Sequence, residues 1–348
     1  MTRYQQLQAD LRTEPRAWLI TGVAGFIGSH LLEALLQLGQ RVTGLDNLST
    51  GTPRNLDDVR SRVDAAAWER FRFLKGSVTD IGLCREASAG ADFVLHQAGF
   101  VSVPLSIQDP VACHDTNATG TLNVLVAARD HSVRRIVLAS SSAVYGDDRR
   151  LPNVEEQTGR PMSPYGATKL IGEIYARQFL QHYGLESICL RYFNIFGPRQ
   201  DPAGGYAAVI PQWIHASLRG EPCRIHGDRG ITRDFCPVFD VVQANLLAAT
   251  TARNSAIGES FNVALGIRTT LEQLHSIIAE KVRTVAGRTP PPVEICPARS
   301  GDIPHSGADI SKIVRELGFA PAGDLAAAIG ETVRWYSAAE AGDLHGPL

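Results

Sequence analysis

Tyr165 and Lys169 stand four residues apart, a spacing that places both side chains on one face of a helix. A tyrosine phenol has a pKa of about 10 and is a poor base at neutral pH, but a neighbouring ammonium stabilises the phenolate and lowers that pKa. Tyr165 could then take the proton of a substrate hydroxyl while the carbon beneath it loses a hydride. The pair indicates oxidation of an alcohol, although a solvated Tyr–Lys pair on a surface helix has the same spacing.

A run of hydroxyl side chains precedes this pair in the chain. Ser140, Ser141 and Ser142 follow an apolar segment and are expected at the end of a sheet strand. A hydroxyl in that place can hydrogen-bond the reacting oxygen and share its proton. The serines therefore favour a catalytic site over an isolated surface pair.

Gly22, Gly25 and Gly28 form a G-x-x-G-x-x-G sequence between an apolar segment and a helix expected to begin near Ile27. Glycines let the backbone approach a pyrophosphate, and the free N–H groups of a helix N-terminus attract the anion. A second predicted strand ends in Asp46, eighteen residues after Gly28, where a carboxylate binds the adenosine ribose hydroxyls. Because that carboxylate also repels the additional phosphate of NADP, the sequence predicts NAD.

These residues need a scaffold that brings the ends of several strands together. Short apolar runs begin near residues 17, 41, 72, 91, 134 and 186, and they alternate with segments of helical periodicity. This alternation predicts an α/β fold with a doubly wound parallel sheet of the Rossmann type. Ligands of such sheets bind beyond the carboxyl ends of the strands.

The pattern changes after about residue 195, where Gly- and Pro-rich loops separate shorter periodic segments. These segments predict a smaller α/β C-terminal domain that binds the substrate. The segment 233–250 has the periodicity of a strand and helix that return to the first domain, so the two domains should interleave. We assign 1–194 and about 233–255 to the NAD-binding domain, and 195–232 and 256–348 to the substrate domain.

Composition limits the function further. The 348 residues are enough for about two domains, and 34 Lys+Arg against 36 Asp+Glu leave a net charge of -2, without a basic stripe for a nucleic acid. No stretch has the length and apolarity of a membrane span, and the first residues lack the apolar core of a signal peptide, so a cytoplasmic protein is expected. The 6 cysteines lack metal-ligand spacing and are interpreted as reduced, mostly buried thiols; no metal is expected.

Motifs along nearly the whole chain resemble the extended short-chain dehydrogenase/reductase family. They are TGVAGFIGSH, GLDNLSTG, HQAG, ASSSAVYG, SPYGATK, RYFNIFGPRQ, RDF and PARSGDI, in the order and spacing of that family. Within it the chain is most similar to nucleotide-sugar 4-epimerases, above all the bacterial UDP-N-acetylglucosamine 4-epimerases. The resemblance implies inversion at C4 of a UDP-sugar through a 4-keto sugar with bound NAD. It also implies a homodimer formed through helices near 115–130 and 165–182.

The same resemblance assigns roles to single residues. Tyr165 becomes the catalytic base, Lys169 orients the nicotinamide ribose, Ser141 binds the sugar O4, and Ser142 assists. The implied cofactor contacts are Gly22, Gly25, Phe26, Ile27, Gly28, Asp46, Asn47, Ser49, Thr50, Gly51, Ser77, Val78, Gln97, Ala98, Tyr165 and Lys169. The implied substrate contacts are Ser102, Ser141, Ser142, Tyr165, Asn194, Ala208, Val209, Arg233, Arg299, Asp302 and Ser306, together with the loop 205–211.

Three positions depart from the family pattern. Ser77 stands where the family usually has an Asp that contacts adenine, and Gly99 and Val101 differ from closely similar epimerases. The shape of the sugar-facing loop 99–103 is therefore left open. None of the three changes affects the catalytic group.

Other functions are compatible with the same scaffold. A UDP-glucose 4-epimerase, or a UDP-hexuronate 4-epimerase or decarboxylase, would use the same cofactor and base. A nucleotide-sugar 4,6-dehydratase needs acids beside the catalytic hydroxyl, where this chain has Ser142 and Ala143. A catalytically silent NAD-sensing regulator would not require the Tyr165–Lys169 pair.

Overall fold

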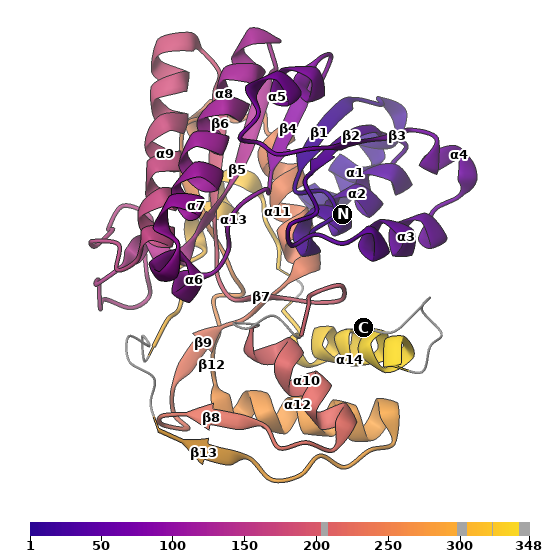
Figure 1. Ribbon diagram of the computed structural model, residues 1–348, viewed down its shortest axis with the longest axis vertical. Helices are drawn as coiled ribbons and strands as arrows, with labels where there is room; N and C mark the ends of the chain where they lie inside the picture. The colour runs from indigo at the N-terminus through magenta and orange to yellow at the C-terminus, as the bar shows by residue number, and fades with distance from the viewer. Residues whose placement is uncertain (203–207, 298–304, 322, 341–348) are drawn as a thin grey trace.

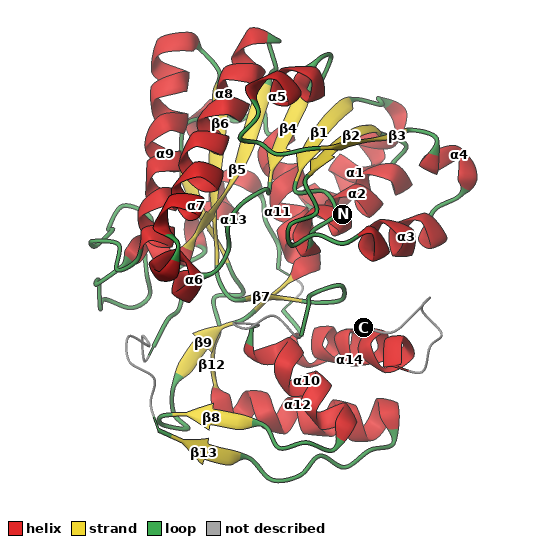
Figure 2. Cartoon of the chain, in the orientation of Figure 1, coloured by secondary structure: helices red, strands yellow, loops and turns green. Residues whose placement is uncertain are grey.

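The computed structural model describes residues 1–202, 208–297, 305–321 and 323–340. A larger region built on a parallel sheet lies above a smaller, mainly helical region (Figure 1). Figure 2 shows strands in the centre of the larger region with helices on both sides, whereas the smaller region has only short strands around its helices. The predicted fold class is confirmed.

The large sheet has seven strands in the order β11-β6-β5-β4-β1-β2-β3, and all neighbours are parallel. The winding reverses between β1 and β4, which is where sheets of this kind open a crevice for a ligand. Strands β1, β4 and β5 are buried along most of their length, as expected for strands covered on both faces. The strands are β1 (Ala17–Thr21), β2 (Arg41–Asp46), β3 (Phe71–Lys75), β4 (Phe93–His96), β5 (Arg135–Ser141), β6 (Glu186–Tyr192) and β11 (Ser260–Val263).

Helices cover both faces of this sheet. Apolar residues of α5, α8 and α9 form one buried cluster, and those of α1, α2, α11 and α13 belong to another. The helices of the larger region are α1 (Arg3–Thr13), α2 (Phe26–Gln37), α3 (Pro53–Arg62), α4 (Ala65–Trp68), α5 (Ile81–Ser88), α6 (Val103–Gln108), α7 (Pro110–His114), η1 (Asp115–Thr119), α8 (Gly120–Asp130), η2 (Ser142–Tyr145), α9 (Pro164–Tyr183), α11 (Val238–Thr250), η3 (Asn254–Ala256) and α13 (Ser311–Leu317).

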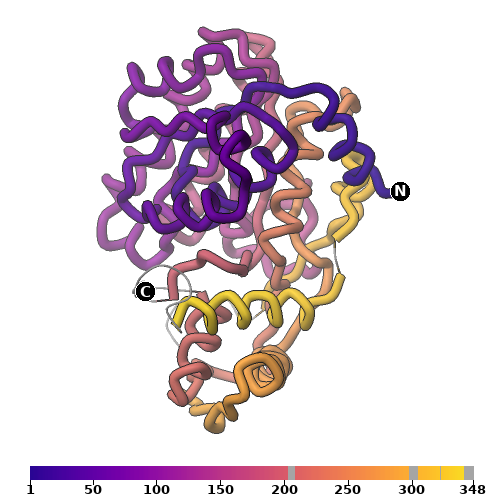
Figure 3. The backbone as a smooth tube through the Cα atoms, turned by 90° about the vertical axis from the view of Figure 1, so that its right-hand side faces the viewer, coloured from indigo at the N-terminus to yellow at the C-terminus, as the bar shows by residue number. Residues whose placement is uncertain are grey.

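Three helices form the core of the smaller region. On α12, Leu274, Ile278 and Val282 recur every four residues and are fully buried against α10 and α14. Figure 3 shows α14 between the larger region and the rest of the smaller one. The helices are α10 (Val209–Arg219), α12 (Leu271–Ala286) and α14 (Leu325–Glu340). The strand pairs are β8 (Arg224–His226) with β13 (Glu294–Cys296), β9 (Thr232–Asp234) with β12 (Arg268–Thr270), and β7 (Ile195–Phe196) with β10 (Cys236–Pro237).

The two regions interleave, but not at the predicted boundaries. Helix α11 returns to the large sheet as expected. However, β9 pairs with β12, so the return begins after residue 234 rather than at 233. β11 pairs with β6, and α13 packs on the same core, although both were assigned to the substrate domain within 256–348. That assignment is wrong for these two elements. Strand β11 has only 4 residues, which is too short to show a periodicity of its own.

The sequence also led to expectations for membrane spans and for the cysteines. The described helices include none with the length and apolarity needed to cross a membrane. Five of the cysteines are buried, and Cys296 is partly exposed; all six are free thiols.

Candidate active site

A cavity of about 950 Å³ lies between the two regions at the carboxyl ends of the sheet strands. Its volume is at the upper end for small-molecule sites. One end is formed by the glycine loop after β1 and by the end of β2, and the other by residues of the smaller region. Predicted residues that line it are Gly22, Gly25, Phe26, Ile27, Gly28, Asp46, Asn47, Ser49, Thr50, Gly51, Ser77, Val78, Gln97, Ala98, Ser141, Ser142, Tyr165, Lys169, Asn194, Ala208, Arg233 and Ser306.

The glycine loop is packed too tightly for side chains. Gly22 has a φ of +70°, and a Cβ there would lie 2.8 Å from the Ala98 nitrogen. A Cβ on Gly28 would lie 2.0 Å from the Gly22 oxygen. Gly25 is the N-cap residue of α2 and has no side chain that could hydrogen-bond the free N–H groups of the first helical turn. These N–H groups therefore remain available at the cavity. This cradle fits a pyrophosphate, which needs close approach to the backbone.

Asp46 is buried at the end of β2, 7% exposed. Its Oδ2 accepts a hydrogen bond from the Ala24 N–H at 2.9 Å, and its Oδ1 accepts one from the Leu48 N–H at 2.8 Å. Each carboxylate oxygen retains a second lone pair. The two oxygens are thus held in place by the backbone and can still accept hydrogen bonds from a ribose diol.

Tyr165 and Lys169 lie in the first turns of α9. Ser163 caps this helix by accepting a hydrogen bond from the Gly166 N–H at 3.1 Å, and proline follows at the first helical position. Lys169 Nζ donates to the Ala139 carbonyl at 2.9 Å and lies 5.9 Å from the centre of the Tyr165 ring. The Tyr165 side chain is hydrogen-bonded to Ser141. The predicted Ser–Tyr–Lys group is therefore assembled at one place.

Burial acts on both titrating groups of this site. It raises the pKa of Tyr165, and the hydrogen bond with Ser141 acts in the opposite direction. The lowering of this pKa that the sequence predicted from the neighbouring Lys169 is therefore not found, because burial of the phenol outweighs it. It lowers the pKa of Lys169 to about 8, because the hydrogen-bond partner of Nζ is a neutral carbonyl rather than a carboxylate. With a pKa of about 8, Lys169 still carries its positive charge at pH 7.

The end of the cavity in the smaller region is polar. Asn194, which has a φ of 34°, donates from Nδ2 to the Asp234 carbonyl at 3.0 Å. Ser306 donates its backbone N–H to the Thr232 carbonyl at 3.0 Å. Because Ser306 is small and Arg233 lies on the same lining, this end offers both space and a cationic group.

Some predicted residues do not reach the cavity. Ser102 is not among its lining residues, because its hydroxyl caps α6 by accepting the Leu105 N–H at 3.2 Å. Val209 begins α10 and packs on the core of the smaller region. Arg299, Asp302 and residues 205–207 lie outside the described residues.

Several lining residues were not predicted. Tyr192 ends β6 and donates its hydroxyl to Gln97 Oε1 at 3.2 Å, while Asn245 Nδ2 donates to the Tyr192 oxygen at 2.9 Å. A hydroxyl at the carboxyl end of a sheet strand was a usable signal for Tyr192. Met162 lines the cavity with more than half of its surface exposed, and no periodicity marks it. Val101, which the resemblance placed in the sugar-facing loop, also lines the cavity.

The loop after β7 is fixed to the NAD-side helices by a buried arginine. Arg199, 5% exposed, donates from Nε to Asp58 Oδ2 of α3 at 2.6 Å and pairs with Glu33 of α2. The next two residues, Gln200 and Asp201, line the cavity. The ion cluster therefore holds this loop against the glycine-loop end of the site.

Known proteins share this sequence and architecture. A UDP-glucose 4-epimerase of Mycolicibacterium smegmatis is 36% identical over 91% of this chain and 97% of its own length. A dTDP-glucose 4,6-dehydratase of Streptomyces griseus is 35% identical over 91% and 93%, respectively. Among solved structures, a UDP-N-acetylglucosamine 4-epimerase from Methanobrevibacter ruminantium, in complex with UDP-N-acetylmuramic acid, has a TM-score of 0.84 at 36% identity and covers 92% of this chain and 98% of its own.

The match to the family itself includes the glycine loop and the catalytic group. It extends over residues 18–264, from β1 through the glycine loop and the Tyr165–Lys169 pair to the end of β11. The chain belongs to the NAD dependent epimerase/dehydratase family.

Proposed function

We propose that this protein is a UDP-N-acetylglucosamine 4-epimerase, which interconverts UDP-N-acetylglucosamine and UDP-N-acetylgalactosamine. One observation carries the proposal: the glycine cradle, the Ser141–Tyr165–Lys169 group and the polar end near Ser306 line a single cavity. The family and the 4-epimerases among the relatives support the reaction class of a UDP-sugar 4-epimerase.

The cradle and Asp46 would hold NAD. The pyrophosphate would lie on the N–H groups that open α2, and the adenosine ribose would lie against the Asp46 carboxylate. Bound NAD would accept a hydride from C4 of the sugar and return it to the opposite face.

Tyr165 is the proton carrier in this proposal. Its phenolate takes the O4 proton as C4 is oxidised to a ketone, and the Lys169 ammonium stabilises that phenolate. Ser141 donates a hydrogen bond to O4 and keeps it near the phenol oxygen. The 4-keto sugar then rotates to present its opposite face while UDP remains bound. Tyr165 returns the proton to O4, and the configuration at C4 is inverted without net oxidation.

The cavity supports an epimerase better than a dehydratase. A 4,6-dehydratase needs acids beside the catalytic hydroxyl, and Ser142 and Ala143 follow Ser141 here. The nearest cavity-lining carboxylate after them in the chain, Asp148, is held by Arg150 at 2.8 Å. It is therefore already committed to an ion pair.

The N-acetyl preference rests on Ser306. A tyrosine in this place would fill the polar end of the cavity, whereas a serine leaves room for a 2-acetamido group. Arg233 on the same lining would bind the diphosphate.

Product analysis tests the proposal. The purified protein is incubated with UDP-N-acetylglucosamine, UDP-glucose and UDP-glucuronate in parallel, and the C4 epimers are separated by chromatography. We expect the N-acetylated sugar to be the best substrate. Release of a 4-keto-6-deoxy sugar, or turnover of the uronate alone, would contradict the assignment. The Tyr165→Phe variant controls for contaminating epimerases.

We also propose a homodimer formed through α8 and α9, which lie side by side at the outer edge of the larger region (Figure 1). On α9, Ile174 and Tyr183 are 54% and 55% exposed, so apolar surface is available for a partner helix pair. Light scattering of the wild type should give twice the mass of the chain, and Ile174→Glu should shift it toward the monomer. A monomeric wild type would overturn this proposal.

A further inference from the structure

Glu173 continues the line of functional residues on α9. Tyr165, Lys169 and Glu173 are spaced by four residues, so they lie on one face of the helix. That face meets the end of β5. Tyr165 is hydrogen-bonded to Ser141, and Lys169 Nζ donates to the carbonyl of Ala139 at 2.9 Å.

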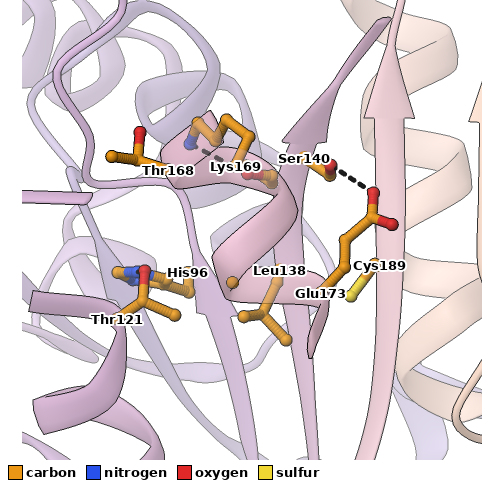
Figure 4. Close-up of a pocket in the computed structure, with 10 residues that line it drawn as sticks. His96, Thr121, Leu138, Ser140, Thr168, Lys169, Glu173 and Cys189 are labelled. Atoms are coloured by element: carbon orange, nitrogen blue, oxygen red, sulfur yellow. Dashed lines mark hydrogen bonds between the residues drawn. The ribbon is translucent and has the colours of Figure 1, made fainter. Parts of the chain in front are cut away.

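Glu173 makes the remaining contact with this strand end. Its Oε1 accepts a hydrogen bond from Ser140 Oγ at 2.5 Å, which Figure 4 shows beside the bond made by Lys169. Residues 139, 140 and 141 are thus each held by a different side chain of α9. These are the last three residues of β5, and they include the serine that we place at the sugar O4.

The charge of Glu173 is balanced from another strand. Arg191 of β6 donates to both carboxylate oxygens, at 2.9 Å and 2.8 Å, and only 5% and 9% of the two side chains are exposed. Such a bidentate pair fixes the carboxylate in position and orientation. Ser260 of β11 donates to Oε2 at 3.1 Å.

This arrangement leaves Lys169 without a carboxylate partner on its own helix. Lysine and glutamate four residues apart commonly pair on a helix. Here a small cavity of about 10 Å³, about the size of one water molecule, is lined by both Lys169 and Glu173 (Figure 4). Arg191 takes the carboxylate, so the ammonium charge remains available to the Tyr165 phenol.

We propose that Glu173 is a positioning residue that fixes Ser140 and Ser141 against α9 while Arg191 keeps its charge away from Lys169. The inference rests on the proposed function for its link to catalysis. Glu173 acts through Ser140, the neighbour of Ser141 on β5, and is not among the residues that line the main cavity. Its removal would misplace the hydroxyl that binds O4, and a displacement of about 1 Å can lower a rate by about a hundredfold.

Two serine variants provide a matched test, because Glu173→Ala would leave the buried Arg191 unpaired and could prevent folding. Ser140→Ala and Ser260→Ala each remove one hydroxyl that donates to Glu173, but only Ser140 belongs to the strand of Ser141. We expect Ser140→Ala to lower kcat by about ten- to a hundredfold with little change in KM. Ser260→Ala should keep kcat within about twofold of the wild type. The two variants should change the melting temperature by similar amounts.

Equal losses of kcat in both variants, or no loss in either, would overturn the proposal. Ser140 also lines the main cavity and could contact the ligand directly. Loss of kcat in Ser140→Ala with an unchanged Tyr165–Ser141 distance in its crystal structure would mean that it does so, and would also overturn the proposal. Crystal structures of the two serine variants give a readout independent of activity: the Tyr165–Ser141 bond should lengthen only in Ser140→Ala. A wild type inactive on every UDP-sugar would refute the proposed function, whereas these structures would still decide the role of Glu173.

Discussion

Replacing Lys169 with methionine separates what this residue does for stability from what it does for the reaction. Methionine keeps a long unbranched side chain and removes the ammonium. Burial lowers the pKa of Lys169 from its ordinary 10.5 to about 8. That difference corresponds to about 3 kcal/mol of folding free energy lost at neutral pH because the buried ammonium is charged.

A second effect acts in the opposite direction. The variant loses the hydrogen bond from Nζ to the Ala139 carbonyl and leaves that carbonyl without this donor, at a cost of about 1–3 kcal/mol. The net expectation is that the cofactor-free variant is at least as stable as the wild type, by up to about 2 kcal/mol. Its epimerase activity should fall by about a hundredfold or more, because the phenolate of Tyr165 loses its stabilising charge.

The pH dependence of folding stability tests whether the charge of Lys169 causes this difference. Between pH 8 and 10.5 the unfolded lysine holds a proton that the folded one has released, so wild-type stability rises with pH relative to the variant. The variant's advantage should therefore be largest at pH 7. By pH 10.5 the charge penalty of the wild type is nearly gone, and the lost hydrogen bond should leave the variant less stable than the wild type by about 1–3 kcal/mol. Denaturant unfolding of the cofactor-free proteins measures the stability difference, and Lys75→Met, at an exposed position on β3, is the matched control.

The reasoning is refuted if Lys169→Met is less stable than the wild type by more than about 1 kcal/mol at pH 7 with an unchanged m-value. A stability difference that does not depend on pH would refute it equally. Either result would mean that the ammonium is better solvated in the cavity than its surroundings indicate.

Other substitutions test the remaining parts of the site. Tyr165→Phe should fold normally and lose about two to four orders of magnitude in kcat, and near-full activity would disprove its role as the base. Ser141→Ala should also be impaired, and more strongly than Ser142→Ala, in the same steady-state assay. Asp46→Ala, combined with an arginine introduced beside it, should weaken retention of NAD and admit NADP, as measured by cofactor extraction after gel filtration. Ser306→Tyr should reduce turnover of UDP-N-acetylglucosamine, because overfilling a packed site costs about 1–3 kcal/mol, and should spare turnover of UDP-glucose. Equal losses on both sugars would mean that Ser306 supports the fold instead.

The parts of the site that depend on neighbours in sequence were predictable. The glycine cradle, the acid at the end of β2 and the Tyr165–Lys169 spacing are local patterns, each contained in a short segment of the chain. Ser102 shows the limit of such patterns, because a hydroxyl that caps a helix is chemically identical to one that binds a sugar.

Contacts between distant residues could not be predicted. The fixing of the loop after β7 depends on Arg199 meeting Glu33 and Asp58, which are far away in the chain. Likewise, nothing near Ser260 in the sequence signals that β11 completes the large sheet. These features arise only when the strands have been ordered in space.

The repeated passage of the chain between the two regions limits how specificity in this architecture can change. Among the elements that the structure describes, successive elements lie in different regions five times: between β6 and α10, between β9 and α11, between β11 and β12, between β13 and α13, and between α13 and α14. The smaller region therefore cannot be exchanged as one continuous segment, since replacing it with that of a relative would require a fusion point at every crossing. New substrate preferences are more accessible through single replacements on the cavity lining, such as the one at Ser306. The five connections also restrict how far the two regions can rotate apart around a ligand in the cavity between them.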